Sequence, residues 1–341
     1  MGKKIVTFGE IMLRLSPPGY KRFVQTDSFD LVFGGGEANV AVSLTGFGLP
    51  AEFITRLPAN ELGEAAIRSL RARNVAVDNI SRGGDRIGIY FLEKGASQRP
   101  SKVIYDRAGS SVAMSRPEDY NWEEIFRGAG WFHFTGITPA LGDNVADICR
   151  VACEEAKKAG LTVSCDLNFR KKLWTSEKAG RVMGELMQYV DVCIANEEDA
   201  EKVFGIKADN TEITEGKLNQ EGYVQVAREL ADRFEFQTVA ITLRESINAS
   251  INRWGAMIHT GGRAYFSKKY QINIVDRVGG GDSFGAGLIY GLQTKKTGEE
   301  ALEFAVAASC LKHTIEGDFN EVTVAEVETL AAGDGSGRVQ R

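Results

Sequence analysis

The chain has 341 residues, of which 43% are hydrophobic and 26% charged, and its formal net charge is −5. A chain of this length can bury a large core without disulfides or structural metals. The slightly acidic balance argues against nucleic acid as a partner. No uncharged apolar run approaches the roughly 18 residues of a membrane-spanning helix, so we expect no membrane partner.

The five cysteines indicate free thiols. Their number is odd, and the one close pair, Cys149 and Cys153, has helical spacing rather than the spacing of metal ligands. Unpaired thiols are typical of reducing compartments. The sequence therefore predicts a cytoplasmic protein. Its three histidines are scattered singly, which argues against a zinc site.

Hydrophobic patterns predict alternating strands and helices along the chain. Short apolar runs favour strands, and longer amphipathic segments favour helices. The expected strands cover 4–8, 51–57, 131–136, 161–168, 190–196 and 238–243, and the expected helices cover 37–48, 61–74, 144–160 and a region from 281 onward. Such alternation is typical of an α/β fold with a mostly parallel central sheet and helices on both faces.

Two segments, 10–36 and 86–108, interrupt this alternation. Both contain stretches in which polar and apolar residues alternate, as in RIGIYFLEKG, with no helix between them. We interpret them as a small β-sheet lid over a cleft, although surface hairpins without a function would show the same pattern. An apolar outer face on this lid would pair with a second subunit, so we expect a homo-oligomer formed through the lid.

The stretch VDRVGGGDSFGAGL, residues 275–288, places three glycines before an acid at the start of a helix. The N–H groups of a glycine-rich turn and of the first helical turn form a donor array that binds anions. Gly279, Gly280 and Gly281 would leave this array free of side chains. Such an array stabilises the charge of a phosphoryl group during its transfer.

Asp282, which follows the glycines, suits two roles. Aspartate is a favoured helix N-cap, and a carboxylate at this place can also act as a general base on an attacking hydroxyl. Capping alone does not require three preceding glycines, so we favour the base. The chain contains no G-x-x-x-x-G-K-[ST] motif and no G-x-G-x-x-G motif after a strand, which excludes a Walker-type NTPase and leaves a dinucleotide fold without its fingerprint.

Read together, GGGEANVAVSL (34–44) and DRVGGGDSFGAG (276–287) resemble the two signatures of the ribokinase-like, or PfkB, carbohydrate kinases. The resemblance implies a ribokinase-like kinase domain over 1–330, with 331–341 as a disordered tail. It also implies ATP as phosphoryl donor and Mg²⁺ as counter-charge.

On the family pattern Asp282 is the catalytic base, and the amides of Gly279 to Asp282 bind the anion. A monovalent-cation site near the loop of Asp276 is a further expectation from the family.

Within the family, four segments are similar to those of kinases that phosphorylate the 6-hydroxyl of 2-keto-3-deoxygluconate: IGIYFLEKG, KVIYDRAGSS, FTGITPAL and DLNFRKKLW. The resemblance assigns eight residues to the sugar acid: Gly35, Asn39, Tyr90, Tyr105, Arg107, Ile137, Arg170 and Asp318. Guanidinium groups and hydroxyls suit a substrate that carries a carboxylate. For either arginine, a surface ion pair is the alternative.

On the nucleotide side, Asn168 and Asn196 resemble the polar residues near the phosphates and magnesium. Asp199 stands where many relatives have glutamate, and would act on the metal through water. After the strand 238–243 the chain reads RESINASINRWGAM, where many relatives have a glycine-rich turn. We expect nucleotide contacts at Arg244 and Ser246, although this segment departs from the family pattern.

Two other functions share the same signatures. One is a kinase for a neutral sugar, such as fructose or ribose, or for a nucleoside. The other is a non-catalytic sugar or nucleotide sensor on the same fold. A sensor has no need of a base, so the intact GGGD run favours the enzyme.

Overall fold

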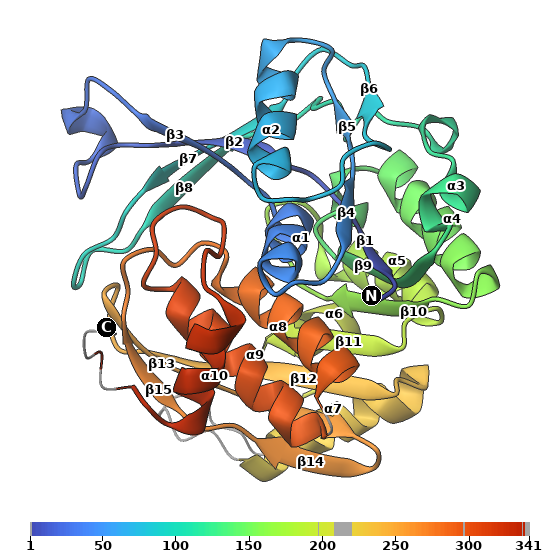
Figure 1. Cartoon of the computed structure of the whole chain (residues 1–341), viewed down its shortest axis with the longest axis vertical. Helices are drawn as coiled ribbons and strands as arrows, with labels where there is room; N and C mark the ends of the chain where they lie inside the picture. The colour runs from blue at the N-terminus through green and yellow to red at the C-terminus, as the bar shows by residue number, and fades with distance from the viewer. Residues whose placement is uncertain (1, 197, 208–219, 296, 336, 338–341) are drawn as a thin grey trace.

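The computed structural model describes residues 2–196, 198–207, 220–295, 297–335 and 337. They form a large, mostly parallel sheet with helices on both faces and a separate small sheet (Figure 1). The predicted fold class is confirmed. Among the described residues, no helix combines the length and the apolar content needed to cross a bilayer, and all five cysteines are free thiols.

Six strands of the large sheet run parallel, in the order β4-β1-β9-β10-β11-β12, followed by the antiparallel strands β13, β14 and β15. Their bounds are β1 (Lys4–Phe8), β4 (Ala51–Ile54), β9 (Ala129–Thr135), β10 (Thr162–Asp166), β11 (Val192–Asn196), β12 (Thr238–Ser246), β13 (Ile251–Thr260), β14 (Arg263–Phe266) and β15 (Tyr270–Asn273).

The antiparallel strands β13, β14 and β15 were not predicted from the sequence. There the chain reverses at Asn248, whose Oδ1 accepts hydrogen bonds from the N–H groups of Ser250 and Ile251. Asparagine favours such turns because its side chain bonds to the backbone two residues on.

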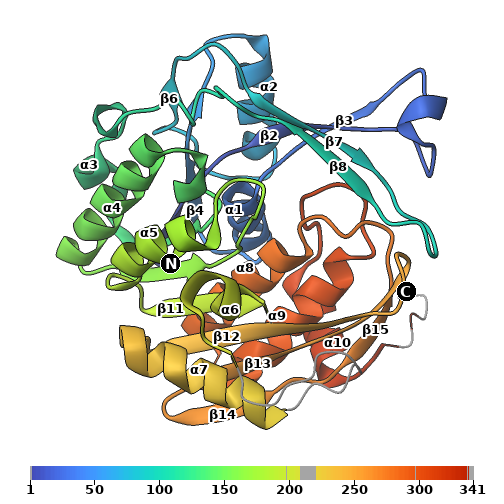
Figure 2. The same ribbon diagram turned by 180° about the vertical axis from the view of Figure 1, so that it is seen from behind.

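The small sheet has the strand order β3-β2-β7-β8 and projects from the body of the molecule (Figure 2). Its strands are β2 (Met12–Ser16), β3 (Asp30–Gly34), β7 (Gly88–Glu93) and β8 (Lys102–Asp106). Strand pairing aligns Arg14, Tyr90 and Tyr105 on one face. The same register puts Leu31, Leu15, Phe91 and Ile104 in a row on the other face, because neighbouring residues of a strand point to opposite sides.

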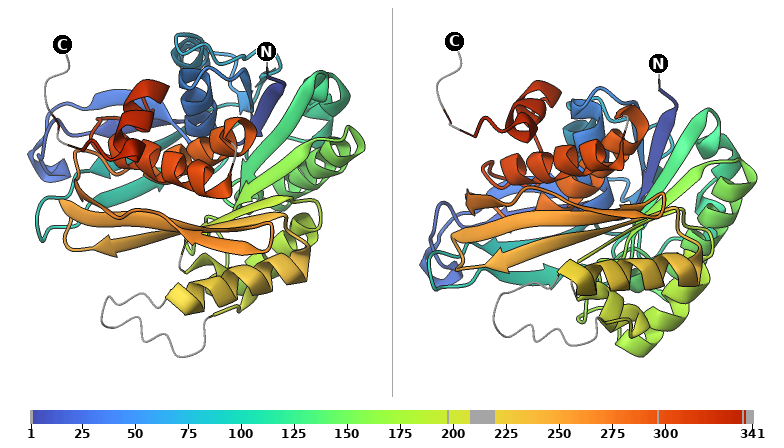
Figure 3. Two further views of the ribbon diagram at one scale, coloured as in Figure 1. Left: turned by 60° about the horizontal axis from the view of Figure 1, so that its bottom comes forward. Right: turned by 90° about the horizontal axis from the view of Figure 1, so that it is seen from below.

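Helices cover both faces of the large sheet (Figure 3). On one face lie α1 (Gly36–Gly46), α2 (Glu61–Arg71), α8 (Gly280–Thr294), α9 (Gly298–Lys312) and α10 (Val324–Ala332). On the other lie α3 (Trp122–Phe126), α4 (Asp143–Lys158), α5 (Ser176–Met187), α6 (Asp199–Phe204) and α7 (Gln220–Phe234). Each face buries its own hydrophobic cluster against the sheet. A short pair, β5 (Arg56–Leu57) and β6 (Ser81–Arg82), lies outside both sheets.

The predicted tail, 331–341, begins in α10, which ends at Ala332. Residues 336 and 338–341 of that segment lie outside the described residues.

Candidate active site

Several of the predicted site residues gather at the carboxyl ends of the parallel strands. β9, β10 and β11 end at Thr135, Asp166 and Asn196, and ligands of open α/β sheets bind outside such ends. The N-terminus of α8 lies near the same edge. Burial, together with the charges of Asp199 and Asp282, raises the pKa of Asp166 well above its usual range. The acid of α8 and the ends of the central strands therefore belong to one site.

The three glycines of the 279–281 turn differ in the space that surrounds their Cα atoms. Gly279 has a φ of 82°, and a Cβ there would lie 2.1 Å from the carbonyl oxygen of Asp318. At Gly280 a Cβ would lie 2.3 Å from the ring of His313, whereas Gly281 has open space beside it. The first two glycines are needed for close packing, and the third leaves the N–H groups of the first helical turn accessible.

Asp282 is the third residue of α8 and does not cap the helix. Gly279 holds the N-cap position, and no side chain bonds to that end. Oδ2 of Asp282 accepts a hydrogen bond from Nδ2 of Asn39 at 2.7 Å, and Oδ1 of Asn39 accepts one from the N–H of Gly35 at 3.3 Å. Burial raises the pKa of Asp282 to about 6, although the Asn39 bond opposes this rise. Such a carboxylate is a better base than an ordinary aspartate.

Asp282 lies close to the start of α1 and to the end of β9. A Cβ at Gly36 would lie 3.6 Å from Oδ1 of Asp282 and 3.4 Å from Cγ2 of Thr135. The half-buried Ile137 donates its N–H to Oγ1 of Thr135 at 3.2 Å. Ile137 thus follows Thr135 closely, and Gly35 and Asn39 are linked to Asp282 through the Asn39 side chain. Their contact with the sugar stays a prediction.

Glu37, which the sequence analysis did not single out, joins α1 to β9. Its Oε1 accepts hydrogen bonds from the N–H of Thr135 (2.9 Å), the hydroxyl of Thr135 (2.8 Å) and the hydroxyl of Thr138 (2.5 Å). A Cβ at Gly9 would lie 2.0 Å from Oε2. Burial raises the pKa of Glu37 to about 7. The sequence feature that could have indicated Glu37 is its position as an acid at the start of a strongly apolar helix.

Asp318 accepts hydrogen bonds from both Tyr90 and a buried arginine of the small sheet. Arg14 donates to Oδ1 of Asp318 at 2.8 Å and to Oδ2 of Asp276 at 2.6 Å, and Tyr90 donates to Oδ2 of Asp318 at 2.5 Å. Only 2% of the Arg14 side chain is exposed. The structure therefore brings the two predicted substrate residues together, with Tyr90 bonded to Asp318 and Asp318 also paired with Arg14. Arg14 was not predicted as a site residue, because its strand pattern alone does not reveal a buried charge.

Arg107 forms an ion pair, which is the alternative left open for it. Its Nε donates to Oε2 of Glu10 at 2.7 Å, and Ser110 donates to Oε1 of Glu10 at 2.5 Å. The guanidinium lies 5.6 Å from the ring centre of Tyr105, and the rings of Tyr105 and Tyr90 are 6.0 Å apart. The pair is largely buried rather than on the surface. It fixes Arg107 beside the tyrosines.

Asn196 and Asp199 bond to each other's backbone at the end of β11. Oδ1 of Asn196 accepts the N–H groups of Glu198 (2.8 Å) and Asp199 (3.1 Å). The carboxylate of Asp199 accepts the N–H of Asn196 and, at its other oxygen, the N–H of Phe169, both at 3.1 Å. Asp199 is buried. Its carboxylate thus holds together the turns that follow β10 and β11.

Arg170, by contrast, is exposed and forms no ion pair within 4 Å among the described residues. Its charge acts on Asp166, Asp199 and Asp282. Asn168 has a left-handed φ of 39°, and its Nδ2 lies 3.4 Å from Oδ2 of Asp166. Asp166 was missed because the sequence shows it only as the last residue of an apolar strand. The carboxyl groups of Asp166, Asp199 and Asp282 therefore lie close enough to repel one another when they are ionised.

Arg277 lies two residues before the glycine turn, and the charge of Arg244 reaches it. Burial and the charge of Arg244 lower the pKa of Arg277, whose Nη2 donates to the carbonyl of Ala249 at 3.3 Å. Arg244 itself is exposed at the end of β12. Ser246 donates to Oδ1 of Asn252 at 3.1 Å. Paired guanidiniums of this kind suit a phosphate chain.

A family model described as pfkB family carbohydrate kinase matches residues 2–322. The chain belongs to this family. It is 34% identical over 339 residues to 2-dehydro-3-deoxygalactonokinase of Haloferax volcanii, with 99% of each chain covered. It is 28% identical to 2-dehydro-3-deoxygluconokinase of Thermoproteus tenax, covering 92% of this chain and 89% of that one.

Among solved structures, the chain is similar to 2-dehydro-3-deoxygluconokinase of Thermotoga maritima. The two are 55% identical, with a TM-score of 0.94 and coverage of 98% of this chain and 99% of that one. The resemblance to the PfkB kinases that the two signatures indicate is therefore confirmed.

In this PfkB kinase the two signatures meet in space. Gly35 and Asn39 come from the first, and Gly279 to Asp282 from the second, and the bond between Asn39 and Asp282 joins them. A Cβ at Gly35 would lie 1.9 Å from the carbonyl oxygen of Glu10. The glycines of both signatures thus allow close approach of backbone around one acid.

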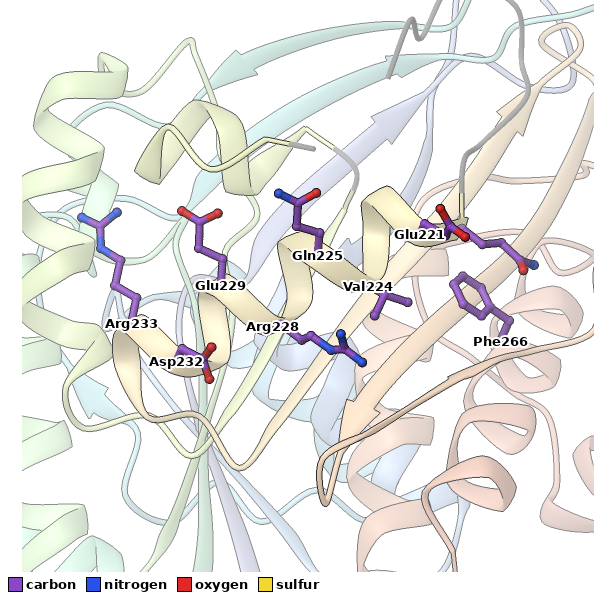
Figure 4. A pocket seen from close by; sticks show the side chains of 9 residues that line it. Glu221, Val224, Gln225, Arg228, Glu229, Asp232, Arg233 and Phe266 are labelled. Carbon is purple, nitrogen blue, oxygen red and sulfur yellow. The ribbon is translucent and has the colours of Figure 1, made fainter. Parts of the chain in front are cut away.

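A hollow of about 900 Å³ beside α7 lies apart from this site. Figure 4 shows its lining, which comes from α7 and from Phe266 of β14. The side chains are mostly charged or amide groups, such as Arg228 and Glu229. None of the predicted site residues lines it.

Proposed function

We propose that this PfkB kinase transfers the γ-phosphoryl group of ATP to the 6-hydroxyl of 2-keto-3-deoxygluconate, also called 2-dehydro-3-deoxygluconate, giving 2-keto-3-deoxy-6-phosphogluconate. The observation that carries the proposal is the position of Asp282. Its carboxylate has a raised pKa, is oriented by Asn39, and belongs to the helical turn whose N–H groups follow the glycines. The names of the 55% and 28% identical relatives support the substrate.

In the proposed mechanism, Asp282 accepts the proton of the 6-hydroxyl as the oxygen attacks phosphorus. The N–H groups of Gly280, Gly281 and Asp282 stabilise the charge of the transferring group. Arg244 and Arg277 hold the phosphate chain of the nucleotide. Arg277 and the base belong to the same segment as the glycine turn, which supports this assignment.

Mg²⁺ fits the carboxyl edge of the sheet. Mutual repulsion with Asp199 and Asp282 contributes to the raised pKa of Asp166, and a divalent cation would relieve that repulsion. Magnesium is usually held by one or two carboxylates, phosphates and water, so Asp166 and Asn168 are suitable ligands, with Asp199 positioning their loop. When bound, the ion neutralises phosphate charge.

For the acid end of the sugar we propose Arg170, because no carboxylate pairs with it among the described residues. Arg107 is already neutralised by Glu10, so we assign it the positioning of Tyr105 and of the small sheet. Closure of this sheet as a lid would keep water from the site and limit hydrolysis of ATP.

The test is the release of ADP from ATP and Mg²⁺, with 2-keto-3-deoxygluconate, its galactonate epimer, fructose, ribose and adenosine offered separately. We expect turnover on the sugar acids and at least 100-fold less on the neutral compounds, because the site presents a guanidinium. Preference for fructose or adenosine would contradict the substrate. Sugar-acid binding without ADP release, by the native protein and Asp282→Asn alike, would identify a sensor.

We also propose that the protein forms homo-oligomers through the small sheet, in a reducing, cytoplasmic compartment that suits its free thiols. The outer row of this sheet is apolar: Leu31 and Ile104 are 52% and 55% exposed, and Phe91 and Leu15 lie between them. Light scattering should give a multiple of 37.2 kDa. Ile104→Glu should reduce it, whereas a native monomer would contradict this proposal.

A further inference from the structure

Lys312, the last residue of α9, is completely buried directly behind the glycine turn. Its Cε lies 3.2 Å from the place where a Cβ of Gly279 would stand, and its neighbour His313 packs in the same way against Gly280. The carbonyl oxygen of His313 accepts the N–H groups of Val275 (2.9 Å) and Asp276 (3.2 Å). The end of α9 therefore packs against the first two glycines of the turn and bonds to the backbone just before it.

Lys312 lies among other buried charged groups of both signs. Burial lowers the pKa of Lys312, and the charge of Arg14 lowers it further. The carboxylates of Asp276, Asp318 and Asp282 oppose this fall and favour the charged ammonium group. Arg14 and Lys312 are both buried cations, and Asp276 and Asp318 are both buried carboxylates. Arg14 and Lys312 therefore balance Asp276 and Asp318, while the third carboxylate, Asp282, is hydrogen-bonded by Asn39. Because burying an uncompensated charge is costly, this pairing leaves neither Asp276 nor Asp318 for a further ion to neutralise.

The oxygen atoms around Asp276 are also already bonded. Oδ2 accepts from Arg14 at 2.6 Å and from the N–H of Gly317 at 3.2 Å, and Oδ1 accepts from the N–H of Val278 at 3.1 Å. The carbonyl oxygen of Ile315 accepts from Nζ of Lys312 at 3.2 Å. A monovalent cation needs several free oxygen ligands, so the loop of Asp276 does not fit one.

We infer that Lys312 is a positioning residue that serves as a built-in cation behind the anion-binding turn, so that phosphoryl transfer by this chain needs no added monovalent ion. The ammonium group donates to the carbonyl oxygen of Ile315 and attracts Asp276 through its charge, while the side chain packs against Gly279. Its positive charge thus lies on the side of the turn opposite to the proposed phosphoryl group. A cation at the carboxyl end of α9 is also favoured by the helix dipole. The inference rests on the proposed function, because phosphoryl transfer is its first readout.

The test compares the native protein with Lys312→Met, which keeps the length of the side chain but removes its charge. Turnover is measured in tetramethylammonium chloride, with K⁺ or NH₄⁺ substituted at constant ionic strength. We expect less than 2-fold change for the native protein. Lys312→Met should lose at least 10-fold in kcat and regain several-fold with K⁺ or NH₄⁺. Leu302→Ala, a buried change on the same helix, should show no such rescue.

A second readout does not depend on turnover. The thermal unfolding midpoint of Lys312→Met should rise in K⁺ relative to tetramethylammonium, because an ion can occupy the vacated place, while that of the native protein should stay the same. Strong K⁺ activation or stabilisation of the native protein would overturn the inference even if Lys312→Met does not fold. So would full activity of Lys312→Met, or a loss that no cation restores. A native protein without kinase activity contradicts the proposed function instead, and the unfolding comparison then decides the inference.

Discussion

Nδ2 of Asn39 donates a hydrogen bond to Oδ2 of Asp282 at 2.7 Å, although 243 positions of the chain separate the two residues. Asn39 is itself fixed by the N–H of Gly35 and by burial in α1. A hydrogen bond to the charged form of a carboxylate favours that form. Asn39 therefore both orients the acid and limits the rise in its pKa that burial causes.

The first prediction concerns the pH dependence of Asn39→Ala. The native kcat/KM should rise with pH through about 6 as Asp282 loses its proton. Without the bond from Asn39 the charged form is less favoured, so the pKa should increase and the acid limb should move to higher pH. The measurement is kcat/KM from pH 5 to pH 9.

Ser43→Ala is the matched control, since Ser43 lies one turn further along α1 and donates only to the carbonyl of Asn39. Its acid limb should coincide with the native one. An unmoved limb in Asn39→Ala would show that Asp282 is not the titrating group, or that Asn39 does not act on it.

The second prediction separates the glycines of the turn. Gly280→Ala places a methyl group against the ring of His313 and should lower the unfolding free energy by about 1–3 kcal/mol. Gly281→Ala meets open space within a helix, so it should be as stable as the native protein or more so, by up to about 1 kcal/mol. If the open space is where the phosphoryl group binds, Gly281→Ala should still lose turnover. Denaturant unfolding and kcat, measured on both variants, test the two effects. A Gly281→Ala variant with native turnover would show that the phosphoryl group binds elsewhere.

The sequence predicts the parallel sheet well because its strands are short apolar runs separated by amphipathic helices. Strand β1 has the predicted bounds, 4–8. The edge at β13 was missed because its order comes from pairing with β12 rather than from local pattern. Asp282 and the glycines could be predicted since one local segment contains them all. Arg14, Glu37 and Lys312 could not, because each is defined by partners far away in the chain.

The third prediction concerns the two arginines assigned to the sugar acid. Arg170→Ala should raise KM for the sugar acid at least 10-fold, because it removes an exposed guanidinium without leaving a buried acid unpaired. Arg107→Ala leaves Glu10 buried without its partner, so it should lower the unfolding free energy by about 3 kcal/mol or more. Steady-state kinetics and denaturant unfolding on both variants separate these effects. The proposed role of Arg170 would be wrong if KM stayed unchanged.

The last prediction concerns the pH dependence of stability. Burial raises the pKa of Glu37 from its ordinary value of 4.5 to about 7. In the folded protein this carboxyl group therefore holds its proton at pH values where the unfolded chain has lost it. Its contribution to stability is complete below pH 4.5 and is lost as the pH rises to about 7, a loss of about 3 kcal/mol.

Glu37→Gln cannot ionise, so its unfolding free energy should fall less than that of the native protein between pH 5 and pH 8. The remaining fall comes from other buried acids, including Asp282, which both proteins share. Denaturant unfolding at several pH values measures the difference, with Glu185→Gln on the exposed face of α5 as a control that should follow the native curve. Parallel curves for Glu37→Gln and the native protein would show that Glu37 is ionised in the folded state, because the three hydrogen bonds that it accepts outweigh the cost of burial.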